Sequence, residues 1–355
     1  MEDKIALVVG VTGITGSSVA DSLIKKGWKT YGLSRNPNIS IESLIPVAAN
    51  LLDEADLQKA LAEVKPSHVY LSTWMRHATE AENIKVNSSM VKNLLNTLSP
   101  HKSIRHVALV TGLKHYLGPF DDYAKGASPL TPFREDHPRL DTPNFYYAQE
   151  DEVYAAAARD GFTWSIHRPH TVIGKAVGNL MNMGTTLAVY ASICKEKGQA
   201  FTWPGSEAQW EGISDMTDAN VLADQLIWAS TTQAAQNKAF NITNGDIFRW
   251  KWMWEQIANY FGLEIQGYTG ENKSLEQQMA GDEEVWNDIA SKYNLKENNL
   301  SKLASAWHTD LDLSRPIEIM TDMSLSRKLG FTTYKPTLDS FIELFEDLRA
   351  DKLIP

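Results

Sequence analysis

A glycine-rich turn near the amino terminus constrains the fold more than any other feature of this sequence. Gly10, Gly13 and Gly16 follow the apolar run 4–10 and open a segment with helical spacing. Gly10 permits a tight turn, Gly13 lets the backbone approach a pyrophosphate, and Gly16 lets the helix pack on the strand. The first amide groups of that helix then point toward the phosphates. The sequence therefore predicts a strand, turn and helix that bind a dinucleotide.

Apolar runs bounded by turn residues alternate with amphipathic segments through the first 175 residues. We predict strands over residues 4–10, 29–34, 45–49, 67–73, 105–111 and 162–167, and helices over 14–26, 53–63, 80–98 and 144–159. This alternation is typical of βαβ units around a parallel sheet, with ligands at the carboxyl ends of the strands. We therefore expect an α/β fold.

The expected organisation is a Rossmann domain with a doubly wound parallel sheet over residues 1–174. A smaller and mostly helical lobe that binds and caps the substrate follows over 175–355, with some segments returning to the Rossmann domain. Methionine and tryptophan become frequent in this second half. That composition suits an apolar substrate pocket.

Composition excludes several classes of partner. The chain has 355 residues, 22% of them charged, and a formal net charge of −10, which disfavours binding to a nucleic acid backbone. No apolar stretch approaches the roughly 18 residues of a membrane span, and the acidic start does not resemble a signal peptide. The single cysteine, Cys194, forms no internal disulfide and no thiol pair for a metal. We expect a cytoplasmic protein without a metal site, and a homodimer remains open.

The end of the second predicted strand bears on the choice of dinucleotide. An NAD-binding domain carries a carboxylate here for the ribose hydroxyls, but this strand ends in Ser34, Arg35 and Asn36. A hydroxyl and a guanidinium can bind the 2′-phosphate of NADP instead. NADPH is therefore favoured over NADH, unless Arg35 is only a solvated surface side chain.

The spacing of the three glycines is similar to that of the short-chain dehydrogenase/reductase superfamily. The resemblance implies a catalytic Tyr-x-x-x-Lys motif, in which the lysine lowers the pKa of the tyrosine. In the matching segment, 144–151, Tyr147 takes the place of the tyrosine and Asp151 that of the lysine. A carboxylate one helical turn away would raise the pKa of a phenol. Another cation is needed, and Lys114, in the loop after the fifth strand, is the candidate.

Several segments together resemble the progesterone 5β-reductase and iridoid synthase-like family, atypical reductases of activated carbon–carbon double bonds. They are the glycine turn and residues 111–120, 144–151, 164–169, 191–195, 214–218 and 240–246. The resemblance implies 1,4-reduction of α,β-unsaturated carbonyl compounds by NADPH, with Δ4-3-keto steroids as candidate substrates. Lys114 and Tyr147 would be the catalytic pair, with Tyr147 donating a hydrogen bond to the enolate. Where plant members carry an aromatic cluster, this chain has Trp307-His308-Thr309, which indicates a more polar or wider pocket.

The expected site residues fall into two further sets. Those expected to bind the cofactor are Gly10, Thr12, Gly13, Ile14, Gly16, Ser34, Arg35, Asn50, Leu51, Ser72, Thr73, Trp74, Thr111, Tyr147, Pro169, Thr171 and Val172. Those expected to contact the substrate, a small enone, are Trp74, Phe120, Phe145, Met181, Met183 and Trp307.

Two other functions remain open at this point. A nucleotide-sugar epimerase or dehydratase, or a carbonyl reductase, would share the fold. A non-catalytic NADP-binding sensor would share it too, without turnover.

Overall fold

The computed structural model describes residues 4–119, 130–176, 178 and 181–355. The chain divides into two compact units. The first comprises residues 1–170, 219–242 and 322–333, and the second comprises residues 171–218, 243–321 and 334–355. Two segments of the C-terminal half thus belong to the first unit.

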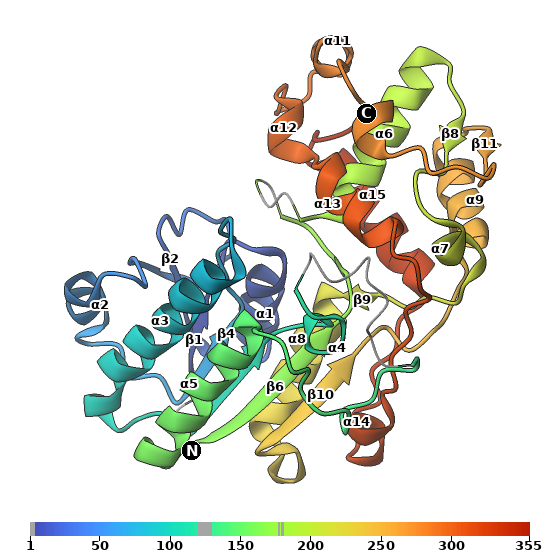
Figure 1. Ribbon diagram of the computed structural model, residues 1–355. Coiled ribbons are helices and arrows are strands. Elements are labelled where there is room, and N and C mark those ends of the chain that lie inside the picture. The colour runs from blue at the N-terminus through green and yellow to red at the C-terminus, as the bar shows by residue number, and fades with distance from the viewer. Residues whose placement is uncertain (1–3, 120–129, 177, 179–180) are drawn as a thin grey trace. The chain divides into compact units, whose positions relative to one another are not determined.

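The first unit is built on a seven-stranded parallel sheet (Figure 1). Its strands are β1 (Ile5–Val9), β2 (Lys29–Ser34), β3 (Ile45–Ala48), β4 (His68–Leu71), β5 (His106–Val110), β6 (Thr163–Pro169) and β10 (Lys238–Ile242). Their order is β10-β6-β5-β4-β1-β2-β3. The predicted fold class and the six predicted strands are confirmed. The sequence prediction missed β10, a five-residue strand far along the chain.

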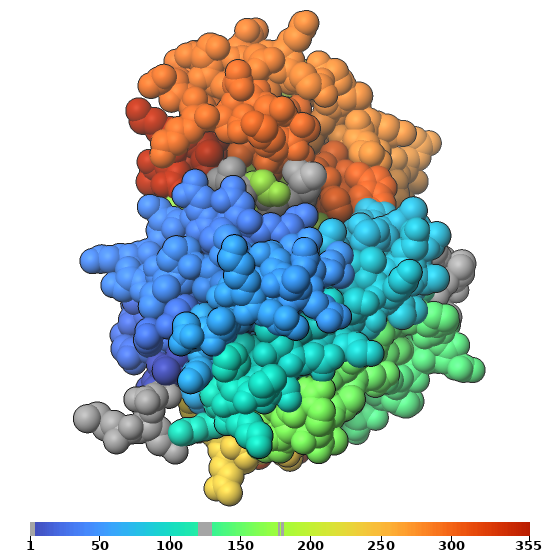
Figure 2. All heavy atoms as spheres, turned by 90° about the vertical axis from the view of Figure 1, so that its left-hand side faces the viewer, coloured from blue at the N-terminus to red at the C-terminus, as the bar shows by residue number. Residues whose placement is uncertain are grey.

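Helices of the first unit cover both faces of this sheet. They are α1 (Ile14–Lys25), α2 (Glu54–Leu61), α3 (Glu80–Leu98), α4 (Lys114–Leu117), α5 (Phe145–Asp160), α8 (Ala219–Thr231) and α14 (Ser324–Lys328), with the 3₁₀ turns η1 (Ser99–His101) and η3 (Gln233–Ala235). Helix α3 packs against α5, and α1 packs against α8. Helices α2, α3 and α5 form one layer, in which α3 contacts both of the others. Figure 2 shows the outer surface of this layer, coloured blue, cyan and green in that order.

Alternation along the strands explains the two layers, because successive side chains of a strand point to opposite faces. Leu7 and Val9 of β1 belong to the apolar cluster that includes Leu94 of α3 and Val153 of α5. The opposite face of the sheet, on which α8 packs, carries buried polar side chains. There His167 of β6 contacts Gln225 of α8, with Nδ1 and Oε1 2.8 Å apart.

Local signals set the helix ends near the site. Thr79 caps α3 through a reciprocal capping box with Glu82. Asn144 caps α5 by accepting a hydrogen bond from the Tyr146 amide at 3.0 Å. Gly161 ends α5 with φ of 81°, a conformation that glycine adopts without strain. The caps at Thr79 and Asn144 therefore fix the first residues of α3, which follows β4, and of α5.

The second unit is mostly helical, as predicted. It contains the helices α6 (Met183–Lys197), α7 (Glu207–Glu211), α9 (Trp250–Phe261), α10 (Leu275–Gln278), α11 (Glu283–Tyr293), α12 (Leu300–Leu303), α13 (Ala306–Leu313) and α15 (Thr337–Ala350), and the short strands β7 (Val172–Ile173), β8 (Phe201–Thr202), β9 (Thr217–Asp218) and β11 (Ile265–Gln266). Trp203, Trp250, Trp254 and Trp286 are fully buried in its core. Much of the aromatic content of this half therefore serves packing. Within the described residues, none of the helices has the length and apolarity to cross a bilayer.

Candidate active site

The glycine turn has the geometry that its sequence predicts. Gly10 follows β1 with φ of +84°, where an L side chain would be strained. A Cβ atom on Gly16 would lie 2.1 Å from the Gly10 carbonyl oxygen, so only glycine fits where α1 meets the turn. Helix α1 begins at Ile14, and its N-cap, Gly13, brings no capping side chain to the first amides. Those amides can therefore serve a phosphate.

A cavity of about 490 Å³ lies beside this turn at the carboxyl ends of the strands. Its lining includes eight of the predicted cofactor residues, namely Gly10, Thr12, Ser34, Arg35, Asn50, Leu51, Thr73 and Trp74. None of the residues that line the cavity carries a carboxylate. Ser34 Oγ is buried and makes no hydrogen bond within the described residues. The cavity thus offers a hydroxyl and a guanidinium where an NAD site would offer an acid.

A second and larger cavity, of about 860 Å³, lies at the opposite edge of the sheet, where the strands begin. Trp28, His68 and His106 help to line it. None of the predicted site residues lines this cavity. Its size alone therefore does not make it the active site.

Two of the predicted cofactor residues already use their polar groups within the sheet. The Ser72 hydroxyl donates to the Val9 carbonyl at 2.8 Å. The Thr111 amide donates to the His167 carbonyl at 2.8 Å and is buried between β5 and β6. Both residues hold strand ends in place at the edge where the cavity opens.

Lys114 is buried beside aromatic rings at the start of α4. Its side chain is 4% exposed, and Nζ lies 3.9 Å from Glu80 Oε2. Nζ also lies 4.7 Å from the centroid of the Phe145 ring, which stacks on Trp74 with centroids 5.1 Å apart. The structure therefore brings Lys114 together with two of the predicted substrate residues.

The Tyr147 hydroxyl makes two hydrogen bonds to the main chain. Its hydroxyl donates to the His115 carbonyl at 2.7 Å and accepts from the Leu140 amide at 3.0 Å. Burial raises the pKa of this phenol above its ordinary value. The hydroxyl proton is given to the His115 carbonyl, so Tyr147 links α5 to α4 and to the segment before α5.

Tyr146, one residue earlier, has its hydroxyl at the carboxyl ends of β5 and β6. The oxygen lies 3.3 Å from the point where a Cβ on Gly112 would stand, and the Pro169 carbonyl oxygen lies 3.4 Å from the same point. Gly112 follows β5 and Pro169 ends β6. The sequence prediction named Tyr147, the second of the two adjacent tyrosines, and did not consider the first. Helical spacing could have indicated the first, because Tyr146 shares a helix face with Glu150, which is buried.

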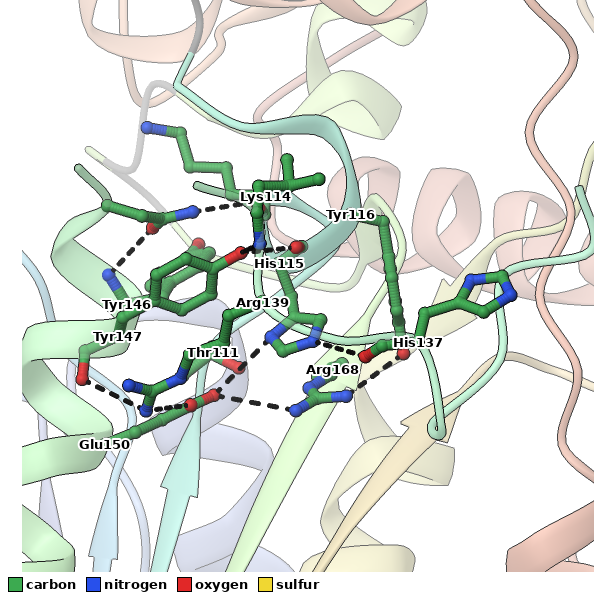
Figure 3. A network of polar contacts seen from close by, with 12 residues as sticks. Thr111, Lys114, His115, Tyr116, His137, Arg139, Tyr146, Tyr147, Glu150 and Arg168 are labelled. Atoms are coloured by element: carbon green, nitrogen blue, oxygen red, sulfur yellow. Dashed lines mark hydrogen bonds and ion pairs between the residues drawn. The ribbon is translucent and has the colours of Figure 1, made fainter. Parts of the chain in front are cut away.

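A network of charged and polar side chains surrounds Tyr147 (Figure 3). Arg139 Nη2 lies 2.7 Å from Glu150 Oε2, and Arg168 Nη2 lies 3.9 Å from Glu150 Oε1. Burial, followed by the positive charge of Arg168, lowers the pKa of His115 to about 3. His115 is therefore neutral near physiological pH.

The remaining predicted residues lie in the second unit or outside the residues that the structure describes. Thr171 donates to Asp312 at 2.7 Å, and Val172 begins β7. Met183 is buried in the core of that unit, Met181 is exposed, and Trp307 meets His308 edge-on with ring centroids 4.7 Å apart. Phe120 lies outside the described residues. Among the described residues no group of three or more His, Cys, Asp or Glu side chains could hold a metal ion.

Comparison with known proteins gives consistent results along the chain. The model of the PRISE-like Rossmann-fold domain family matches residues 36–355. The chain is 38% identical to the 3-oxo-Delta(4,5)-steroid 5-beta-reductase of Arabidopsis thaliana, and 37% identical to an (S)-8-oxocitronellyl enol synthase of Nepeta cataria. Each alignment covers 99% of this chain and 94% of the relative.

Among solved structures, a UDP-glucose 4-epimerase of Thermotoga maritima aligns with a TM-score of 0.69. That alignment covers 98% of this chain and 99% of the epimerase, at 13% sequence identity. An epimerase of Methanothermobacter thermautotrophicus aligns with a TM-score of 0.70 and 14% identity, over 98% of this chain and 93% of that protein. At such low identity these likenesses show the fold alone.

Proposed function

Because the chain belongs to the PRISE-like Rossmann-fold family, as its motifs indicated, we propose that it reduces activated carbon–carbon double bonds with NADPH. The substrate is an α,β-unsaturated carbonyl compound, an enone or an enal. The observation that carries the proposal is the placement of Lys114 and the Tyr146 hydroxyl. Lys114 is buried against Phe145, and the Tyr146 hydroxyl lies at the carboxyl ends of β5 and β6.

The residues of the smaller cavity fit a dinucleotide with a 2′-phosphate. Gly10 and Gly16 admit no side chain, the first amides of α1 have no capping side chain, and the buried Ser34 hydroxyl has an unused hydrogen-bonding capacity. Arg35 adds a positive charge at the same edge. When bound, NADPH supplies a hydride for the β-carbon of the substrate.

The protein stabilises the negative charge that develops on the carbonyl oxygen. In this proposal the Tyr146 hydroxyl donates a hydrogen bond to that oxygen, and the Lys114 ammonium provides the positive field. Water is scarce around a side chain that is 4% exposed, so the field acts at low dielectric and is stronger than in bulk water. The α-carbon then takes its proton from solvent.

The proposal corrects the pair expected from the sequence by one residue. Tyr147 keeps the loops around Lys114 in place through its two backbone hydrogen bonds, and Tyr146 takes over the donor role. An aspartate four residues after Tyr147 then has no effect on the reacting group. It lies on the surface, where its side chain is 62% exposed.

The test is consumption of NADPH with a small cyclic enone, its saturated ketone and a Δ4-3-keto steroid, each repeated with NADH. The expected result is oxidation of NADPH with the enones and none with the saturated ketone. Equal rates with the ketone would instead indicate a carbonyl reductase. No consumption with any of them would contradict the proposal.

We also propose that the protein works in the cytoplasm on a small-molecule substrate. Its one cysteine, Cys194, is buried in α6 and forms no disulfide, as is usual in a reducing compartment. Assembly as a homodimer stays a prediction.

A further inference from the structure

Glu150 is a buried acid on the helix that carries both tyrosines. It lies four residues after Tyr146 on α5, and its side chain is 1% exposed. An isolated buried carboxylate is costly, so such a group is normally paired with cations or hydrogen-bond donors. The partners of Glu150 therefore indicate what its burial achieves.

Three side chains converge on this carboxylate, each from a different segment (Figure 3). Arg139, from the segment that precedes α5, donates to Oε2 at 2.7 Å. Arg168, at the end of β6, and His115, in α4, approach Oε1 with their nitrogens at 3.9 and 4.0 Å. Glu150 thus joins α4, α5, β6 and the segment before α5 at one point.

Each partner in turn holds a part of the proposed active site. Arg139 donates to the Tyr147 carbonyl at 3.4 Å, and its guanidinium lies 4.8 Å from the Tyr147 ring. Arg168 donates to the Tyr116 hydroxyl at 3.2 Å, which donates to Asn241 of β10 at 2.7 Å.

His115 directly follows Lys114, and its carbonyl receives the Tyr147 hydroxyl. The Lys114 carbonyl itself accepts from the Asn144 side chain at 2.8 Å, at the cap of α5. The start of α4, which carries Lys114, is therefore tied to α5 and its cap by two hydrogen bonds.

The charges make this arrangement depend on Glu150. Burial raises the pKa of Glu150, and the positive charges of Arg168 and Arg139 lower it in part. Without the carboxylate, two guanidinium groups would face each other across the same small space. Asp151 cannot replace it, because it reaches only Arg139 and lies on the surface.

We propose that Glu150 is a positioning residue for the reductase. Its carboxylate draws Arg139 and Arg168 together beside the neutral His115, and so fixes the start of α4, with Lys114, relative to the Tyr146 hydroxyl. In the wider superfamily the residue four places after the tyrosine is a lysine. Here the residue at that spacing from Tyr146 is Glu150, which has the opposite charge. It holds in place the segment around α4, and α4 supplies the lysine, Lys114. This inference rests on the function proposed above.

The test compares Glu150→Gln with the neighbouring Asp151→Asn. Both variants remove one negative charge that binds Arg139, but only the first removes the buried one. For Glu150→Gln we expect kcat for enone reduction to fall about 10- to 100-fold, the usual scale for misplaced reacting groups. The dissociation constant for NADPH, followed by its fluorescence, is expected to change less than about twofold, because Glu150 does not line the cofactor cavity. Asp151→Asn is expected to keep kcat within about twofold of the wild type.

Three further variants protect the test against a failure to fold. Arg139→Gln changes a residue whose side chain is 35% exposed, and Glu150→Asp keeps the charge on a shorter side chain. The double variant Glu150→Gln/Arg139→Gln is expected to lose no more activity than the worse single variant, since both act through one pair. Partial rescue of kcat by Glu150→Asp is expected as well.

The outcomes separate this inference from the proposed function. A wild type that oxidises no NADPH with enones would end the proposed function and the inference with it. An active wild type with a Glu150→Gln variant of equal kcat would overturn only the inference. So would a loss of NADPH binding as large as the loss of kcat, because that result would mean general damage to the first unit.

Discussion

The glycine turn and the polar network around Glu150 lie in the same unit, yet they are built in different ways. In the turn, three glycines within seven residues let the main chain itself form the binding surface. In the network, side chains from α4, α5, β6 and the segment before α5 meet through charge and hydrogen bonds. The turn therefore has no room for a side chain at Gly10 or Gly16, whereas the network depends on the sign and position of each charged side chain.

The largest effect is expected from adding one methyl group to the turn. In Gly16→Ala the new Cβ would lie 2.1 Å from the Gly10 carbonyl oxygen, and backbone cannot move aside cheaply. We expect loss of NADPH binding and a low yield of folded protein, measured by fluorescence titration and thermal unfolding. Gly27→Ala is the control, because nothing lies within 4 Å of its Cβ. It should cost only about 1 kcal/mol for a positive φ. Normal NADPH binding by Gly16→Ala would show that the turn is not built as described.

The two adjacent tyrosines test the network side of the comparison. Tyr146→Phe is expected to lower kcat by about 10²- to 10³-fold while NADPH still binds, the usual loss for one donor to a developing oxyanion. Tyr147→Phe leaves the His115 carbonyl and the Leu140 amide without their hydroxyl partner. It should therefore lower the free energy of unfolding by about 1–3 kcal/mol and affect kcat less. The reverse pattern would return Tyr147 to the catalytic role predicted from the sequence.

The same contrast explains how far sequence reasoning could go. The turn, the first six strands and the position of Ser34 and Arg35 at a strand end are local patterns, and the sequence predicted them. Glu150 and Arg168 are 18 residues apart in the chain, and no local pattern says that they meet. The choice between Tyr146 and Tyr147 depends on a rotation of 100° about the helix axis. Helical spacing bears on that choice, and so do the hydroxyl partners of Tyr147, which lie in other segments of the chain.

Acid is expected to weaken the polar face of the first unit. Burial lowers the pKa of His106 to about 3 and that of His167 to about 4, against an ordinary value of 6.5. Such histidines take up protons on unfolding. Between the pKa of the folded state and about pH 6.5, the unfolded state therefore binds more protons than the folded state. Their contribution to stability is full above about pH 6.5 and falls by about 1.4 kcal/mol per pH unit and per histidine below it.

Denaturant unfolding at a series of pH values measures this slope. In His167→Gln the free energy of unfolding should fall less steeply between neutral and mildly acid pH. The difference in slope corresponds to one proton, about 1.4 kcal/mol per pH unit. Gly27→Ala, which changes no titratable group, should keep the wild-type slope. An equal slope in His167→Gln would mean that His167 is not the neutral, buried group of this face.

The smallest effect is expected at the exposed end of the cofactor cavity. Arg35 follows β2 on the surface, and its guanidinium is the charged group beside the buried Ser34 hydroxyl. Arg35→Gln should raise the KM for NADPH about tenfold, the lower end of what a hydrogen bond to a charged group contributes, because solvent screens an exposed charge. The KM for NADH should stay unchanged, since NADH has no 2′-phosphate. Arg105→Gln, at the amino edge of the sheet, serves as the control for loss of a surface charge. If Arg35→Gln weakened both cofactors equally, Arg35 would act on the adenosine common to both, and the preference for NADPH would have to come from Ser34 and the main chain of the turn.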